Sequence, residues 1–268
     1  MTNHSILAIH GIGAGDGKAR QGFSNELRDL VFSGSTQQES IWHECVWEDL
    51  NDNIDAQVSA IVQQLLKAYR KDWIRCEPSR FKRIWKNFLI LCQNASIIAC
   101  GGLASLTLDL GLDFVLYLDS THGEKVRSRL RKRIIDVSNE TKNGIILLAH
   151  SLGSVIAYDT LAESVLSQEA LPVKKLITFG SPLDWTFNLR NSESKPESAF
   201  KSIGNIPWHN FYYKEDYVSL HKPLPVEQFP NVKNFELLLP KSSNKAKSHC
   251  AYWTDSNFAN EIKKLLAP

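Results

Sequence analysis

The chain has 268 residues, of which 43% are hydrophobic and 22% are charged, and it contains 14 glycines. These values exclude a disordered chain, a collagen-like chain and a disulfide-stapled miniprotein, and they fit one large globular domain. The 31 basic and 29 acidic residues leave a net charge of +2. Because nucleic-acid binding needs a strongly basic face, we expect no nucleic-acid partner.

The cysteines and the N-terminus give no sign of an exported protein. The cysteines are odd in number and include no CxxC pair, so we expect neither a disulfide framework nor a zinc site. Residues 1–10 lack a basic segment followed by a long apolar core, and they read as a strand that starts almost at once. The sequence therefore predicts a cytoplasmic protein.

Short apolar runs bounded by turn residues alternate with helical patterns along the chain. The apolar runs predict strands at residues 5–9, 41–47, 144–149, 175–179, 208–213 and 232–238. Amphipathic or helix-forming patterns predict helices at residues 18–32, 53–69, 123–138, 152–166 and 254–266. This alternation is typical of an α/β protein with a mostly parallel six-stranded sheet flanked by helices.

The sharpest motif is Ala149-His150-Ser151-Leu152-Gly153, which lies between an apolar strand and a helix. Small residues two positions before and two after the serine allow a tight, strained turn that lifts its hydroxyl off the sheet. A helix that begins at Leu152 would also point its N–H groups at this hydroxyl. A purely structural turn is the alternative, but the flanking strand and helix favour a nucleophilic serine.

With this motif the chain resembles the α/β-hydrolase superfamily, and in particular its lipases and esterases. The segment Ala8-Ile-His-Gly-Ile-Gly13 is similar to the oxyanion loop of that family. The resemblance implies an α/β-hydrolase fold, with an oxyanion hole formed by the backbone N–H groups of Ile12 and Leu152. It also implies a substrate site with contributions from Gly11, Gly13, His150 and Ser181. Nucleotide binding by this loop is the weaker interpretation, because it lacks the GxGxxG spacing and no GK[ST] follows.

The resemblance further implies the chain order serine, acid, histidine for a catalytic triad. His249 lies between the last predicted strand and the final helix, where the family has its base. His209 falls within a predicted strand, and His221 could lie at the surface, so both are weaker candidates.

Three carboxylates after Ser151 compete for the role of the acid. Asp216 is the favoured one, because it follows a predicted strand and Asp216-Tyr-Val is similar to the Asp-Pro-Val found in the family. Asp184 comes second, since it follows the preceding strand, and Glu215 comes third. Any of the three could instead be a solvated loop carboxylate.

Residues 72–118 exceed what a crossover needs, and we expect them to form a helical apolar cap or lid inserted in the single domain 1–268. Residues 95–112 contain one charge, Asp109, and follow a basic cluster at 80–86. A buried cap or core, a lid that touches lipid and a membrane span are the three interpretations. Internal charges weaken the last of them. Contact of residues 80–118 with an anionic membrane surface would make the protein membrane-associated and its acyl substrate long and apolar.

These expectations combine into one functional hypothesis. The chain is predicted to be a serine hydrolase that cleaves carboxylic esters of acyl or lipid-like substrates through an acyl-enzyme, without a metal or another cofactor. An acyltransferase or thioesterase with the same triad is an alternative, as is a catalytically silent binding module. No pattern indicates an oligomeric state.

Overall fold

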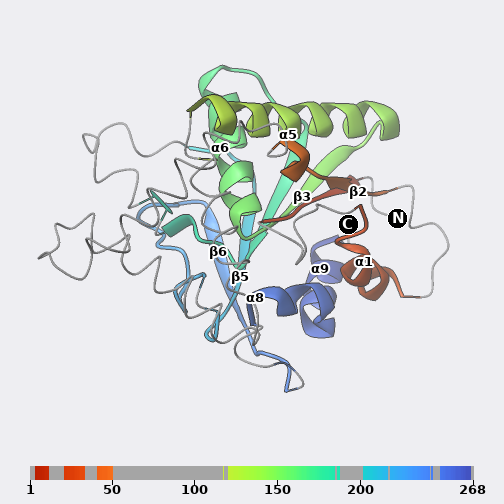
Figure 1. The fold of residues 1–268 in the computed structure, drawn as a ribbon, viewed down its shortest axis with the longest axis vertical. Coiled ribbons are helices and arrows are strands. Elements are labelled where there is room, and N and C mark those ends of the chain that lie inside the picture. The colour runs from red at the N-terminus through yellow and green to blue at the C-terminus, as the bar shows by residue number, and fades with distance from the viewer. Residues whose placement is uncertain are drawn as a thin grey trace, which may run out of the picture.

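The computed structural model describes residues 4–11, 21–33, 41–50, 117, 120–184, 186–187, 202–216, 218–241, 243 and 248–266. Six strands in these residues form one sheet in the order β2-β1-β3-β4-β5-β6 (Figure 1), and every neighbouring pair is parallel. The strands are β1 (His4–Ile9), β2 (Trp42–Cys45), β3 (Gly144–His150), β4 (Val173–Phe179), β5 (Trp208–Tyr213) and β6 (Val232–Leu237). The predicted α/β class and parallel six-stranded sheet are thereby confirmed.

Helices cover both faces of the sheet (Figure 1). The helical elements are α1 (Asn25–Phe32), η1 (Glu48–Leu50), α5 (Ser120–Thr141), α6 (Leu152–Leu166), α8 (Ser248–Ala251), η4 (Tyr252–Thr254) and α9 (Ser256–Leu266). In β1, Leu7 and Ile9 face the core beneath α5 and α6, whereas Ile6 and Ala8 face the core beneath α1 and α9. Strands buried on both faces carry apolar residues at consecutive positions, which is why residues 6–9 of β1 and 145–149 of β3 are unbroken apolar runs.

The predicted helix ends agree with the structure to differing degrees. Helix α6 has the predicted bounds, whereas α5 extends three residues further at each end than the predicted 123–138. The helix predicted from residue 18 begins only at Asn25, because residues 21–24 form a turn in which Gly22 has a φ of 92°. The helix expected at 53–69 and the insertion expected at 72–118 lie outside the described residues, apart from Tyr117.

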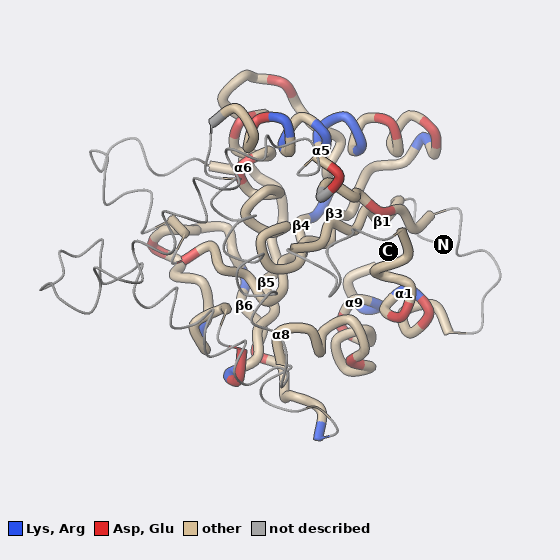
Figure 2. The backbone as a smooth tube through the Cα atoms, in the orientation of Figure 1, with Lys and Arg blue, Asp and Glu red and all other residues tan. Residues whose placement is uncertain are grey.

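Helix α5 carries a run of basic residues with acidic residues toward both of its ends (Figure 2). Arg127 and Arg131 both form ion pairs with Glu163 on α6, at 2.8 and 3.2 Å. Arg129 pairs with Asp49 at 3.0 Å. Arg127, Arg129 and Arg131 therefore join α5 to its neighbours. Among the helices that the structure describes, none is both long and apolar enough to cross a membrane.

The strand order reverses direction between β1 and β3. From β1 the chain moves outward to β2, and it then returns to place β3 on the other side of β1. At such a point, the connections that follow the two adjacent strands run in opposite directions. The crevice between them, at the carboxyl ends of the strands, is where open α/β sheets bind ligands. Gly11 follows β1 there, and Ser151 follows β3.

Candidate functional site

Ser151 is the single residue that joins strand β3 to helix α6. Its backbone has φ 53° and ψ −130°, a conformation that is sterically costly for a residue with a side chain. Its N–H donates to the carbonyl of Phe179 at 3.1 Å, which continues the ladder between β3 and β4. The predicted strained turn is therefore present, and it is held in place by the adjacent strand.

The start of α6 lies tightly against the end of β1. A side chain on Gly153 would place its Cβ only 2.5 Å from the carbonyl oxygen of His10, so only glycine fits at this position. One turn into the helix, the hydroxyl of Ser154 donates to the Ser151 carbonyl at 2.6 Å. The backbone on both sides of the serine hydroxyl is thus fixed.

His249 lies on the short helix α8, between β6 and α9, in the interval of the chain where it was predicted. Its Nε2 lies 2.8 Å from Ser151 Oγ, and its Nδ1 lies 3.0 Å and 3.1 Å from the two carboxylate oxygens of Asp216. Because a carboxylate only accepts, Nδ1 carries the proton and the lone pair of Nε2 faces the serine hydroxyl. The imidazole is therefore arranged to accept the serine proton.

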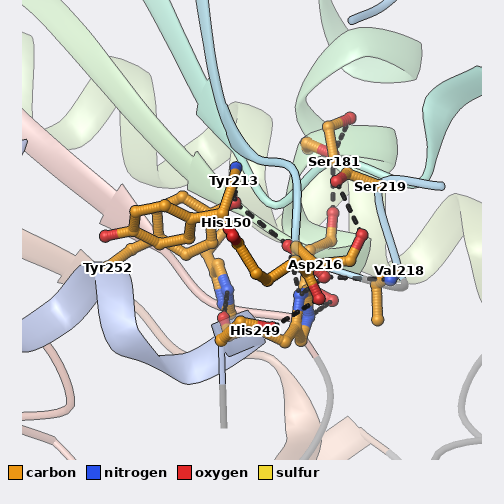
Figure 3. A network of polar contacts seen from close by, with 12 residues as sticks. His150, Ser181, Tyr213, Asp216, Val218, Ser219, His249 and Tyr252 are labelled. Atoms are coloured by element: carbon orange, nitrogen blue, oxygen red, sulfur yellow. Dashed lines mark hydrogen bonds and ion pairs between the residues drawn. The ribbon is translucent and has the colours of Figure 1, made fainter. Parts of the chain in front are cut away.

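Asp216 is fully buried, whereas the side chain of His249 is 23% exposed. Oδ1 of Asp216 accepts the N–H of Val218 at 2.9 Å, and Oδ2 accepts the hydroxyl of Tyr252 at 3.0 Å (Figure 3). Burial alone would raise the pKa of Asp216. The charge and hydrogen bond of His249, with those two further donors, instead hold the pKa below its usual value. The carboxylate is therefore ionised at neutral pH.

The other candidate residues lie away from this hydrogen-bonded chain or are bonded elsewhere. Asp184 forms an ion pair with Lys222 at 2.6 Å, and the backbone carbonyl of Glu215 accepts the hydroxyl of Ser248 at 2.9 Å. His209 lies on β5, stacked against Phe235, and His221 is exposed and bonds to the carbonyl of Lys214. The backbone N–H of His221 also donates to the Asp216 carbonyl at 3.0 Å, but the carboxylate of Asp216 is the one that contacts the imidazole of His249.

His150 and Ser181, which were expected to contribute to a substrate site, are buried and bonded to protein groups. Nε2 of His150 donates to the backbone carbonyl of His249 at 2.8 Å, since a carbonyl can only accept. Burial, followed by the nearby His249, lowers the pKa of His150 to about 3, so its ring is neutral. The Ser181 hydroxyl lies 2.7 Å from that of Ser154. Both side chains thus hold the site together in this structure.

The loop after β1 is described only as far as Gly11, so Ile12 and Gly13 lie outside the described residues. A Cβ on Gly11 would lie 2.7 Å from Ser151 Oγ and 3.1 Å from the backbone nitrogen of Leu152. Nδ1 of His10 donates to the Gly11 carbonyl at 2.6 Å, and its ring stacks on Trp47. Burial lowers the pKa of His10 to about 4. His10 therefore supports the loop as a neutral ring.

Sequence reasoning overlooked Tyr252, which contacts the carboxylate of Asp216. A signal for it exists, because Tyr252 follows His249 by three residues and residues so spaced share one side of a helical turn. No cluster of three or more His, Cys, Asp or Glu side chains suited to a metal ion occurs in the part of the chain that the structure describes.

Comparison with known proteins identifies no relative. No protein-family model, no curated protein and no solved structure matches the chain significantly.

Proposed function

We propose that the protein is a serine hydrolase of the α/β-hydrolase type, which cleaves carboxylic esters through a triad of Ser151, His249 and Asp216. The observation that carries the proposal is the continuous chain of hydrogen bonds from Ser151 Oγ through His249 to Asp216. Such a chain at a strained strand-to-helix turn is the arrangement that activates a serine for attack on a carbonyl.

In the proposed reaction, His249 Nε2 takes the proton of Ser151 as Oγ attacks the ester carbonyl. The imidazole becomes positively charged, and the ionised, buried Asp216 stabilises that charge and keeps Nδ1 protonated. The protonated Nε2 then gives its proton to the leaving alcohol. Water attacks the resulting acyl-enzyme by the same route, and the serine is regenerated.

The backbone N–H of Leu152 is the described candidate for binding the oxyanion. It belongs to the first residue of α6, where N–H groups have no acceptor within the helix. A Cβ at Gly11 would overlap the side chain of Ser151, so the absence of a side chain allows the backbone after β1 to lie close to Ser151 Oγ and to the Leu152 nitrogen. The oxygen of a bound carbonyl would carry negative charge at this place in the transition state, where an N–H donor contributes most.

Labelling with a fluorophosphonate probe tests the proposal. We expect wild-type protein to be labelled and Ser151→Ala to be unlabelled, whereas Ser164→Ala, which alters a buried serine further along α6, should be labelled as wild type. A p-nitrophenyl ester series from short to long acyl chains then measures turnover. Absence of both labelling and turnover in folded wild-type protein would refute the proposal.

The choice of acid is tested separately. Asp216→Asn should reduce ester turnover by about 10³–10⁴-fold, because an amide favours the wrong imidazole tautomer. Asp184→Asn should leave turnover within about twofold, since Asp184 is paired with Lys222. The reverse ranking would assign the acid to Asp184.

A further inference from the structure

We propose that Tyr252 is a positioning residue for the hydrolase reaction, because its hydroxyl fixes the carboxylate of Asp216 in its two-point contact with His249. This inference depends on the proposed function, since it concerns the same three side chains. It adds a fourth, Tyr252, which touches neither the serine hydroxyl nor the space in front of it in the described contacts.

The direction of the hydrogen bonds around the phenol is determined by their partners. The Tyr252 hydroxyl accepts the backbone N–H of Tyr213 at 3.0 Å. A phenol has only one proton, and an N–H cannot accept, so that proton is given to Oδ2 of Asp216 at 3.0 Å. Both carboxylate oxygens lie within hydrogen-bond distance of His249 Nδ1, at 3.0 and 3.1 Å. Tyr252 therefore holds one of the two oxygens that contact the imidazole.

Burial makes this donor difficult to replace. Tyr252 and Asp216 are both fully buried, so bulk water cannot substitute for the phenol if its hydroxyl is removed. Burial and the negative charge of Asp216 raise the pKa of Tyr252 well above its ordinary value, so the phenol stays protonated across the working range of pH. The hydrogen bond is thus present in every ionisation state that the reaction visits.

Tyr252 also connects the segment that carries the base to the segment that carries the acid. It lies three residues after His249, while Tyr213, the last residue of β5, lies three residues before Asp216. The two tyrosine rings stack with centroids 4.2 Å apart (Figure 3). One side chain thus fixes both the rotation of the carboxylate and the distance between the two segments.

Removal of the hydroxyl has a defined chemical consequence. Without that donor, the negative charge of the carboxylate is less compensated by hydrogen bonds. Its attraction to the protonated imidazole of His249 is therefore stronger in the free enzyme. The acid limb of the pH–rate profile should therefore move to higher pH. The freed Oδ2 can also rotate, which should lower kcat by about tenfold, as expected for loss of one hydrogen bond to a charged group. KM should change little, because the phenol does not contact substrate.

The test compares Tyr252→Phe with Tyr213→Phe. Each substitution removes one buried phenol hydroxyl that donates to a buried carboxylate, but the hydroxyl of Tyr213 donates to Asp255 at 2.6 Å and not to Asp216. Labelling by the fluorophosphonate is measured across pH, thermal unfolding reports the stability of both variants, and NMR of ¹⁵N-histidine-labelled protein follows the exchange of the His249 Nδ1 proton with water.

We expect Tyr252→Phe alone to slow labelling, shift its acid limb to higher pH and speed exchange of the Nδ1 proton. Equal effects of the two variants, or an unchanged pH profile and exchange rate in Tyr252→Phe, would overturn the inference. Failure of the proposed function has a different signature, which is an unlabelled wild-type protein. The proton-exchange measurement would then still decide whether Tyr252 orders the contact between Asp216 and His249.

Discussion

The Cα of Gly11 faces the side chain of Ser151 so closely that a Cβ at Gly11 would lie 2.7 Å from Ser151 Oγ. The two residues follow β1 and β3, the adjacent strands between which the strand order reverses. The backbone at the end of one strand thus forms part of the surroundings of the hydroxyl at the end of the next. This contact is the basis of the first prediction.

Gly11→Ala should displace Ser151 Oγ and lower the rate of fluorophosphonate labelling by about 100-fold, since a misplacement of about 1 Å at a nucleophile has an effect of that size. Gly144→Ala is the matched control at the opposite end of β3, where the added methyl meets only the flexible side chain of Lys174. We expect the control to be labelled at the wild-type rate. Similar labelling of the two variants would mean that the Ser151 turn adapts to the added methyl group.

Gly180 lies beside His249 and Asp216 with a φ of 57°, whereas Gly204, with a φ of 71°, lies beside Val165 at the end of α6. Alanine at either position should lower the free energy of unfolding by about 1 kcal/mol, because both backbones are left-handed. Only Gly180→Ala places a Cβ near the site, 3.0 Å from His249 Cε1. We therefore expect both variants to lose stability in urea denaturation, with the larger loss in Gly180→Ala because of this tight contact. Labelling should be slower in Gly180→Ala alone, and a similar slowing in Gly204→Ala would contradict this.

The buried ring of His150 should make the protein sensitive to acid. Burial lowers its pKa from 6.5 to about 3, so between these values the unfolded chain binds a proton that the folded chain does not. The free energy of unfolding should therefore fall as the pH falls through this window, by up to about 1.4 kcal/mol per pH unit for this group. The measurement is urea denaturation at several pH values between 7.5 and 4.5 for wild type and His150→Gln.

His150→Gln should be less stable than wild type at pH 7.5, but it should lose less stability as the pH falls. Ser181→Ala serves as the control, since it changes a buried residue near the site without removing a titrating group. Its loss of stability should be the same at every pH. Parallel curves for wild type and His150→Gln would show that His150 does not contribute to the acid sensitivity.

Ser181→Ala also distinguishes a supporting residue from one that binds substrate. The Ser154 hydroxyl uses its single proton on the Ser151 carbonyl, so Ser181 donates to Ser154. Its loss leaves a buried oxygen without that donor and should lower the free energy of unfolding by about 1 kcal/mol. We expect KM for p-nitrophenyl esters to stay within about twofold of wild type, which is the spread usual for a residue without substrate contact. A large rise in KM with unchanged stability would restore Ser181 to the substrate site.

Local sequence patterns were enough to predict the parallel sheet and the position of Ser151 between a strand and a helix. Strand β3 and helix α6 are local features, because an unbroken apolar run marks a buried strand and helix-forming residues mark the segment after Ser151. The strained turn at Ser151 could also be predicted, because its backbone conformation requires small residues two positions before and two positions after the serine. His249 and Asp216 were placed by chain order and by resemblance, so the sequence left Asp184 and Glu215 open.

The contacts of Asp216 with His249 and Tyr252 could not be predicted from local patterns. A hydrogen bond between residues 33 or 36 positions apart depends on how the segment after β5 packs against α8 and η4, which no local pattern encodes. Likewise, the ion pair that occupies Asp184 depends on Lys222, a residue on a different connection. Length and composition describe an ordinary globular chain. The long-range contacts from Asp216 through His249 to Ser151 are what distinguish this serine from the other buried serines of the protein.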